Sequence, residues 1–332
     1  MKTALVLACD DKYVPFTTVV ARQIVRSSTE TLPPITVISD GVSDENKALA
    51  TQFCPQIEFL EAAPLFNDHA LPVTSAFSRA AHLRLFLDEI LADFDHAVYL
   101  DSDISVLADV SPLLAMRPKS GPIIAAHDLH IMVAKAYRER LQISGPYFNS
   151  GVMVLDLKAI RAERIFAEAL RYAQTYPERC EMVDQDPLNA VLDGRWQTLD
   201  WRWNAMNYMS QLLPKQPFIR HFAGCKPWAP KKVGLETHYI DQWRSDLGDS
   251  PWTGCFQQEI FKYRFRRIFK PATSIVNQFA KSWLYASSAG KRGNRARLVN
   301  DFPTILSAIE RAAATNAIAN SLVPNELNLT AA

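Results

Sequence analysis

Apolar runs with the composition of β-strands alternate with helical segments up to about residue 125 of this 332-residue chain. Alternating strands and helices predict βαβ units that assemble into a parallel sheet. Because the strands are continuous apolar runs, both faces of the sheet should be covered. The expected fold class is therefore α/β, with a Rossmann-like, mostly parallel central sheet flanked by helices. We expect strands at Thr3–Cys9, Ile35–Ser39, Ile57–Leu60 and Ala97–Leu100, and helices at Val14–Arg26, Asp44–Gln52 and Ser78–Leu91.

The pattern becomes mixed in the second part of the chain, where no internal repeat is found. A buried strand is expected at Phe148–Leu157, followed by a helix at Ala159–Tyr172. A short helix at Pro187–Leu192 and a further strand at Trp196–Trp203 complete the expected elements.

Charge is distributed unevenly along the chain. Residues 1–261 carry 25 basic and 32 acidic side chains, whereas Lys262–Val299 contains ten basic residues and no acidic one. An acidic body argues against a nucleic-acid-binding core, which would need cations over its working face. We therefore expect a catalytic domain at 1–255 and a basic helical C-terminal extension at 256–332. Bases interleaved with aromatic residues in the extension suit an anionic membrane surface as well as they suit a solvated helix.

The five cysteines are scattered and odd in number, and they form no C-x-x-C motif. This predicts neither a zinc module nor a disulfide framework, and it favours a reducing compartment. The apolar run Thr3–Cys9 is too short for the core of a signal peptide, and no run approaches the ~18 apolar residues of a membrane span. We expect a cytoplasmic protein, with peripheral attachment to the inner face of the cytoplasmic membrane as an open alternative.

Acidic residues follow two of the expected strands. In open parallel sheets, ligands bind beyond the carboxyl ends of the strands, and Asp101-Ser102-Asp103 comes directly after Ala97–Leu100. Two carboxylates at positions i and i+2 of extended backbone project to one face, and paired hard oxygen ligands suit Mg²⁺ or Mn²⁺. The same D-x-D spacing occurs at 93–95 and 184–186, so the spacing alone is also compatible with a polar strand end.

A histidine and a lysine far downstream are candidates for the same site. The softer nitrogen of His221 would shift preference from magnesium toward manganese. Lys226 could meet a phosphate as a point charge, and Gly224 would let the backbone approach closely. Taken alone, His221 could be an ordinary buried histidine, and Lys226 could be a solvated lysine beside a turn.

Two amide-containing segments complete the set of candidates. Asn149, placed two residues before Gly151, could bind a sugar hydroxyl where the backbone comes near, or it could simply belong to a turn. Asp184-Gln185-Asp186 precedes Pro187, which fits the first turn of a helix with Asp186 as its N-cap. Asp184 and Gln185 would then face whatever lies beside the helix end.

Taken together and in this order, these segments resemble family 8 of the glycosyltransferases, a retaining group that includes bacterial lipopolysaccharide galactosyl- and glucosyltransferases and glycogenin. The resemblance implies a GT-A fold that transfers a hexose from a UDP-sugar with retention at the anomeric carbon. The implied donor is UDP-glucose or UDP-galactose, and the implied acceptor is a saccharide such as a lipopolysaccharide or another glycolipid. The resemblance rests on Cys9–Tyr13, Arg84, Leu100–Asp103, Asp128, Phe148–Val152, Asp184–Asp186 and the segment from His221 to Trp228.

The resemblance also implies a role for each matching residue. Asp101, Asp103 and His221 match ligands of Mn²⁺, for which Mg²⁺ could substitute. Gln185 matches the side chain near the anomeric carbon, so it forms the expected catalytic set with Asp184 and the diphosphate contact Lys226. The expected donor-binding residues are Asp10, Tyr13 (stacked on uracil), Arg84, Asp101, Ser102, Asp128, Asn149, Gly224 and Lys226.

Gln185 carries no charge and is a poor nucleophile. We therefore expect front-side attack by the acceptor, with a phosphate oxygen of the leaving group accepting the acceptor's proton and the metal neutralising the departing UDP. Two other classes of function stay open. One is a metal-dependent phosphoesterase that uses Asp101, Asp103, His127, His130 and His221. The other is a catalytically silent protein that binds a UDP-sugar.

Overall fold

The computed structural model describes residues 1–66, 79–132, 134–206, 216–224, 226–228 and 237–254. The basic extension expected at 256–332 lies outside the described residues. Within them, no helix combines the length and the apolar character needed to cross a membrane.

A seven-stranded sheet with the order β3-β2-β1-β4-β7-β6-β8 forms the centre of the described structure. Strands β1, β2, β3 and β4 run parallel, and β8 runs parallel to β6. Strand β7 is antiparallel to both of its neighbours, β4 and β6. The expected mostly parallel α/β sheet is confirmed. The strands are β1 Thr3–Asp10, β2 Ile35–Asp40, β3 Ile57–Glu61, β4 His96–Leu100, β6 Ile123–His127, β7 Phe148–Asp156 and β8 Gln197–Thr198, with a separate antiparallel pair β5 Ile104–Val106 and β9 Ile219–His221.

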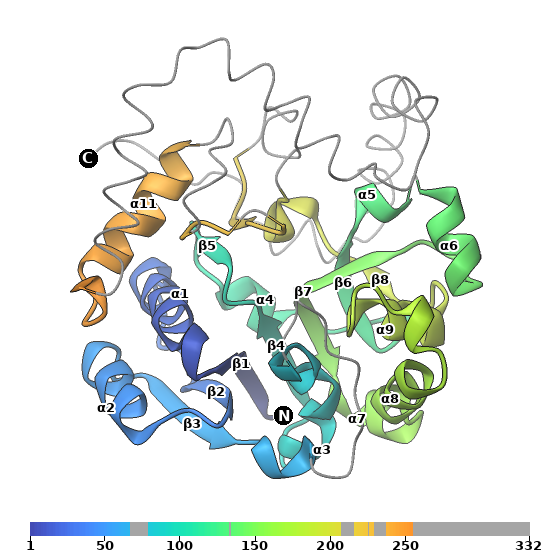
Figure 1. Ribbon diagram of the computed structural model, residues 1–332, viewed down its shortest axis with the longest axis horizontal. Helices are drawn as coiled ribbons and strands as arrows, with labels where there is room; N and C mark the ends of the chain where they lie inside the picture. The colour runs from blue at the N-terminus through green and yellow to red at the C-terminus, as the bar shows by residue number, and fades with distance from the viewer. Residues whose placement is uncertain (67–78, 133, 207–215, 225, 229–236, 255–332) are drawn as a thin grey trace.

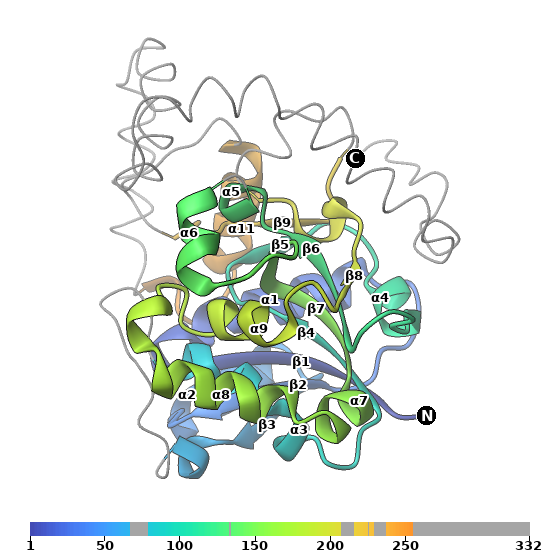
Figure 2. The same ribbon diagram turned by 90° about the vertical axis from the view of Figure 1, so that its right-hand side faces the viewer.

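Helices cover both faces of the sheet, as the continuous apolar strands predict. Alternate side chains of β1 enter two different cores: Leu5 and Leu7 pack into one, and Ala4 and Val6 into the other. The first core includes residues of α1, α2 and α4, and the second includes residues of α3, α7, α8 and α9. Figure 1 shows these two layers on opposite sides of the strands, and Figure 2 views the molecule from the side of α8 and α9. The helices are α1 Val14–Ser27, α2 Asp44–Phe53, α3 Leu87–Ile90, α4 Ser111–Ala115, α5 Leu129–Met132, α6 Lys135–Leu141, α7 Leu157–Ala162, α8 Ile165–Thr175, α9 Gln185–Leu192 and α11 Thr237–Gly248.

Helix α11 lies beside α1 although more than 200 residues separate the two in the sequence (Figure 1). The buried carboxylate of Asp246 accepts hydrogen bonds from the side chains of Gln23 (2.6 Å) and Arg26 (2.8 and 3.1 Å) on α1. The other end of the Gln23 amide accepts the backbone N–H of Val106 in β5. These polar contacts tie α11, α1 and the β5–β9 pair into one unit beside the sheet edge that carries the candidate site.

Three expected elements differ from the structure. The segment expected as a helix at Ser78–Leu91 forms a 3₁₀ helix at Arg79–Phe86 before α3. Five successive residues of that segment, His82 to Phe86, are buried, so this stretch lacks the alternation of buried and exposed sides that an amphipathic α-helix presents. Ser78 itself lies outside the described residues.

The other two differences arise from local backbone chemistry. The helix expected at Ala159–Tyr172 is divided into α7 and α8, because Arg164 adopts a left-handed conformation with φ of 55° between them. Of the strand expected at Trp196–Trp203, only Gln197–Thr198 (β8) pairs with another strand, β6. Beyond β8, the Asp200 carboxylate accepts the backbone N–H of Arg202 and starts a 3₁₀ helix at Trp201–Asn204, which turns the chain away from the sheet.

Candidate functional site

The topology of the sheet brings the candidate residues to one edge. Strands β1, β4 and β6 run in the same direction, so Asp10, the last residue of β1, lies at the same end of the sheet as Asp101 and Asp128, which follow β4 and β6. Strand β7 runs in the opposite direction, and its first residues therefore lie at that same end. The backbone N–H of Asp101 donates to the carbonyl of Gly151 (2.8 Å), which places the start of β7 directly beside the end of β4.

Asp101-Ser102-Asp103 forms a bend between β4 and β5, and it is not the extended segment that the sequence predicts. The hydroxyl of Ser102 turns away from the two carboxylates toward α1, where it lies 2.7 Å from the Thr17 hydroxyl and donates to the carbonyl of Ala8 (3.2 Å). The convergence of the carboxylates thus comes from a bend held against α1 and not from the period of a strand.

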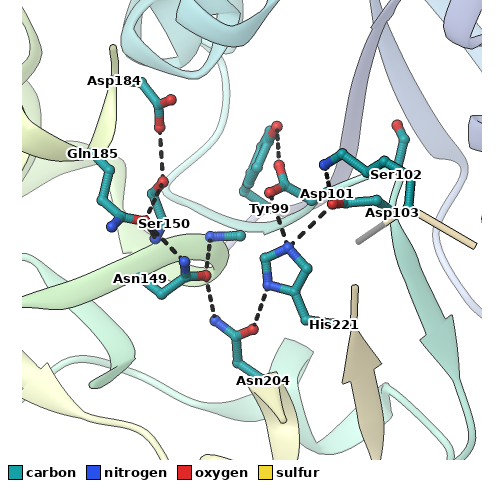
Figure 3. A network of polar contacts seen from close by, with 12 residues as sticks. Tyr99, Asp101, Ser102, Asp103, Asn149, Ser150, Asp184, Gln185, Asn204 and His221 are labelled. Atoms are coloured by element: carbon teal, nitrogen blue, oxygen red, sulfur yellow. Dashed lines mark hydrogen bonds and ion pairs between the residues drawn. The ribbon is translucent and has the colours of Figure 1, made fainter. Parts of the chain in front are cut away.

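Asp101, Asp103 and His221 come together despite about 120 intervening residues (Figure 3). His221 Nε2 lies 3.7 Å from Asp101 Oδ2 and 3.3 Å from Asp103 Oδ1. One ligand atom from each residue falls within 4.8 Å of the other two, and in the described part of the chain this is the one such group of three or more potential ligands. Two carboxylate oxygens and one imidazole nitrogen fit Mn²⁺ or Mg²⁺ well.

Lys226 lies directly against this group. Its ammonium forms an ion pair with Asp103 Oδ2, on the carboxylate whose other oxygen faces His221. Burial alone would raise the pKa of Asp103, but the ammonium of Lys226 outweighs burial and holds the pKa well below its usual range. In the same way, burial would lower the pKa of Lys226, but Asp103 outweighs it and raises the pKa. Both groups are therefore charged at neutral pH.

Arg84 supplies a second buried positive charge. Its guanidinium pairs with Asp101 (2.8 Å) and with Asp184 (3.1 Å), and it also donates to the hydroxyl and carbonyl oxygens of Ser150 (both 2.9 Å). Burial would lower the pKa of Arg84, but the two carboxylates raise it well above its ordinary value. Arg84 thereby links the candidate metal ligand Asp101 to Asp184 at the start of α9.

Gly151 makes room for the candidate metal ligands. A Cβ atom at this position would lie 2.4 Å from Cε1 of His221 and 2.8 Å from Oδ2 of Asp101. Real Cβ atoms do not come that close to other heavy atoms, so any larger residue would displace the cluster. The glycine of the N-S-G segment is thus explained by the packing of His221 and Asp101 against the backbone of β7.

The side-chain amide of Gln185 is hydrogen-bonded at both ends inside the protein, and Figure 3 shows the contacts of its oxygen with Asn149 and Ser150. Its oxygen accepts from the Asn149 amide (2.9 Å) and from the backbone N–H of Ser150 (3.1 Å). Its nitrogen donates to Asp128 (3.2 Å) and to the hydroxyl of Tyr147 (3.1 Å). The structure therefore gathers Gln185, Asn149 and Asp128, which the sequence separates by as many as 57 residues.

The N-cap position of α9 is occupied by Asp184 and not by Asp186, which the sequence predicts there. Helix α9 begins at Gln185 with Asp184 at its N-cap position, and the Asp184 side chain makes no capping hydrogen bond but pairs with Arg84 and accepts from Ser150 Oγ (2.7 Å). Burial raises the pKa of Asp184, partly offset by Arg84. The expected cap Asp186 lies inside the helix, where its carboxylate accepts from the hydroxyls of Tyr147 (2.5 Å) and Tyr137 (2.8 Å) and from a backbone N–H.

Asp10 is the last residue of β1, one residue beyond the strand expected from the sequence, and Tyr13 lies in the short 3₁₀ turn that follows. The Asp10 carboxylate accepts the backbone N–H of Tyr13 (3.2 Å) and so shapes the turn into α1. The Tyr13 ring meets the Trp228 ring edge-on at 5.6 Å, and Trp228 in turn is stacked on Phe16 at 3.7 Å. Gly224, which adopts a positive φ of 74°, lies in the segment between His221 and Lys226.

Asn204 and Tyr147 belong to this cluster but were not identified from the sequence. Asn204 bridges His221 and Asn149, and Tyr147 bridges Gln185 and Asp186. No motif marks either residue, although Asn204 ends the W-R-W-N segment shortly before the histidine strand. Both make contacts that only the folded chain creates.

His127, a ligand in the phosphoesterase alternative, has a different environment from His221. Its ring lies 3.2 Å from the hydroxyl of Thr198 and packs edge-on against Trp196. Burial lowers its pKa to about 4. Within the described residues it does not join Asp101 and Asp103 in a metal-binding group. The side chain of His130 lies outside the described residues.

Burial raises the pKa of Asp186 to about 6, partly offset by Tyr147 and the Met182 N–H. The folded protein then holds the proton more tightly than the unfolded chain, so this stabilisation is present below pH ~4 and is lost as the pH rises through 6. We expect wild type to lose about 2–3 kcal/mol relative to Asp186→Asn between pH 4 and pH 7. Thermal unfolding of both proteins between pH 4 and pH 7 measures this change in relative stability. A stability difference between the two proteins that does not vary with pH would contradict the prediction.

Known proteins resemble this chain in sequence and in fold. General stress protein A of Bacillus subtilis is 31% identical over 221 residues, which cover 58% of this chain and 75% of that protein. Lipopolysaccharide 1,2-glucosyltransferase of Escherichia coli strain K12 is 30% identical over 200 residues, which cover 55% of this chain but only 58% of the enzyme.

The fold matches a crystal structure of the galactosyltransferase LgtC in complex with donor and acceptor sugar analogues. The TM-score is 0.67 at 24% identity, over 76% of this chain and 99% of that chain. The expected GT-A architecture is thereby confirmed. Residues 4–232, well over half of the chain, match the family described as glycosyl transferase family 8. This chain therefore belongs to glycosyl transferase family 8.

Proposed function

We propose that this glycosyltransferase moves glucose or galactose from a UDP-sugar to a saccharide acceptor, with retention at the anomeric carbon and with Mn²⁺ at Asp101, Asp103 and His221. The observation that carries the proposal is the convergence of these three ligands within 4.8 Å, directly beside Lys226. A divalent ion beside a fixed lysine cation suits a nucleoside diphosphate, because both positive charges can neutralise the negative charge of the diphosphate.

The identities of donor and acceptor come from the relatives. One is named as a lipopolysaccharide 1,2-glucosyltransferase, and the LgtC galactosyltransferase has the same fold. These names favour a hexose donor and a lipopolysaccharide or other glycolipid acceptor. The choice between glucose and galactose depends on contacts with the sugar hydroxyls, and we expect Asp128, Asn149 and Asp184, which surround Gln185 and Ser150, to make them.

The proposed mechanism follows from the charges of the site. When bound, the divalent ion supplies Lewis-acid neutralisation of the diphosphate as the glycosidic bond breaks. Lys226 holds a fixed positive charge beside Asp103, and Arg84 holds one beside Asp101 and Asp184. Exclusion of water strengthens their effect on the departing UDP. The developing negative charge is thus stabilised by groups that need not reorganise.

Gln185 is uncharged, and each end of its amide already makes two hydrogen bonds within the protein. It therefore orients or stabilises the sugar and does not attack it. Retention then follows from attack by the acceptor on the face that the phosphate leaves, and a phosphate oxygen takes the acceptor's proton. Bond formation to the acceptor oxygen and cleavage of the bond to UDP occur on one face of the ring.

We expect Asp103→Ala to lower kcat by about 10²–10³-fold, since it removes a metal ligand and the partner of Lys226. A panel of UDP-sugars with Mn²⁺, scored by mass spectrometry of UDP and glycosylated product, measures the effect. Asp93→Ala, an exposed carboxylate of another D-x-D pattern, is the control and should transfer sugar normally. Normal transfer by Asp103→Ala would exclude the metal assignment, and release of phosphate from simple diesters would favour a phosphoesterase.

The front-side mechanism predicts that no glycosyl–enzyme intermediate accumulates. Intact-protein mass spectrometry after incubation with UDP-sugar and Mn²⁺, without acceptor, should show only the mass of the unmodified chain. The same measurement with a slow donor such as a fluorinated UDP-sugar gives any intermediate time to build up. A hexose attached to a carboxylate in the site would contradict front-side attack.

We also propose that the catalytic domain at 1–255 carries a basic region at 256–332 that attaches to anionic membrane surfaces. The ten bases between Lys262 and Val299, interleaved with aromatic residues, support this role, at about 1 kcal/mol per base near such a surface. The full chain should pellet with anionic vesicles at low salt, and a chain lacking residues 262–332 should not. Equal pelleting of the two chains, or none at any salt, would contradict the proposal.

A further inference from the structure

Asn204 lies at the junction between the candidate metal ligands and the buried amides. It is fully buried at the end of the 3₁₀ helix Trp201–Asn204. The next residue, Ala205, exchanges backbone hydrogen bonds with β9, accepting the N–H of His221 (2.9 Å) and donating to the carbonyl of Ile219 (3.0 Å). This pairing fixes the Asn204 side chain next to the imidazole of His221 (Figure 3).

The amide of Asn204 makes one contact at each end. Its nitrogen donates to Oδ1 of Asn149 (2.9 Å), and its oxygen lies 2.8 Å from Nδ1 of His221. The orientation is fixed by the backbone, because Asn149 Oδ1 also accepts the N–H of Gly151 (3.0 Å). A backbone N–H can only donate, so Asn149 must present its oxygen there, and Asn204 must present its nitrogen to Asn149 and its oxygen to His221.

This orientation determines the tautomer of His221. Because Asn204 offers an oxygen, Nδ1 of the imidazole must carry the proton and donate it. Nε2 of the neutral ring is then left with a free lone pair, and Nε2 is the atom that faces Asp101 and Asp103. A divalent ion needs such a lone pair. In metal sites, the group that is hydrogen-bonded to the other ring nitrogen usually fixes the tautomer of the ligating histidine.

The series of hydrogen bonds continues from Asn149 to Gln185. Asn149 donates its amide nitrogen to Oε1 of Gln185, and the backbone N–H of Ser150 pins that oxygen from a second direction. His221, Asn204, Asn149 and Gln185 therefore form one series of hydrogen bonds in which every donor and acceptor is determined. Its starting residue is a proposed metal ligand, and its last amide is the expected neighbour of the anomeric carbon.

We propose that Asn204 is a positioning residue that fixes His221 as the Nδ1–H tautomer for the divalent ion and joins the ion site to the Asn149 and Gln185 amides. The proposal rests on the proposed Mn²⁺ site. A purely space-filling role for Asn204 would predict that only volume matters at this position. The hydrogen-bonding role predicts that two variants of nearly the same volume behave differently.

Asn204→Leu keeps the volume and removes both contacts, whereas Asn204→Asp keeps an acceptor for His221 and removes the donor to Asn149. Asn189→Leu is the matched control, since this equally buried amide contacts only the backbone of Phe148 and Gln185. Melting temperatures of all three variants report folding. Ion binding is measured without nucleotide by the electron paramagnetic resonance signal of free Mn²⁺.

We expect Asn204→Leu to weaken Mn²⁺ binding by about 10–100-fold, and Asn204→Asp to bind Mn²⁺ within about threefold of wild type but to transfer sugar more slowly. Asn189→Leu should bind Mn²⁺ as wild type does. Nitrogen-15 NMR of histidine-labelled, ion-free protein, with the His221 signals assigned by their loss in His221→Gln, should show Nδ1 protonated in wild type and a mixture of tautomers in Asn204→Leu.

Mn²⁺ binding by Asn204→Leu equal to wild type, or equal weakening in Asn204→Leu and Asn204→Asp, would overturn the proposal. If Asn204→Leu fails to fold, the comparison of Asn204→Asp with wild type decides the question. If wild type binds no Mn²⁺, the proposed metal function fails, whereas the tautomer of His221 in ion-free protein still tests the role of Asn204.

Discussion

Burial of carboxylates at the edge of the sheet requires positive charge close by, and Arg84 and Lys226 provide it. Arg84 pairs with Asp101 and Asp184, and Lys226 pairs with Asp103. Without Lys226, desolvation would favour protonation of Asp103, and a protonated carboxyl is a poor metal ligand. The paired charges keep Asp103 ionised and hold the site in a form that can accept a divalent ion and a diphosphate.

The candidate site also depends on the antiparallel direction of β7. Because β7 begins where its neighbours end, Ser150 and Gly151 bring their backbone N–H groups to the ends of β4 and β6. Gly151 lets His221 and Asp101 lie against the strand. The two N–H donors fix the direction of the amides of Asn149 and Gln185. One strand reversal thus serves both the metal ligands and the amide network.

The site combines two kinds of polar structure with different consequences for chemistry. The charged part, with its carboxylates, Arg84 and Lys226, suits the change in charge that occurs when a nucleoside diphosphate departs. The neutral part, centred on Gln185, is saturated with hydrogen bonds and offers no nucleophile. This division suits the front-side attack proposed above, because the leaving group and the sugar would then be stabilised by separate groups.

The sequence by itself determined the α/β class, the positions of most strands, and the convergence of Asp101 and Asp103 with His221. These features follow from periodicity, from the rule that ligands bind at strand ends, and from motifs whose order resembles a family. The tertiary structure alone decided the bend at Ser102, the pairing of Asp184 with Arg84, the interior position of Asp186, and the roles of Asn204 and Tyr147. The physical reason is that a hydrogen bond depends on which side chains meet across strands and helices. Residues dozens of positions apart carry no mark of that meeting in their local sequence.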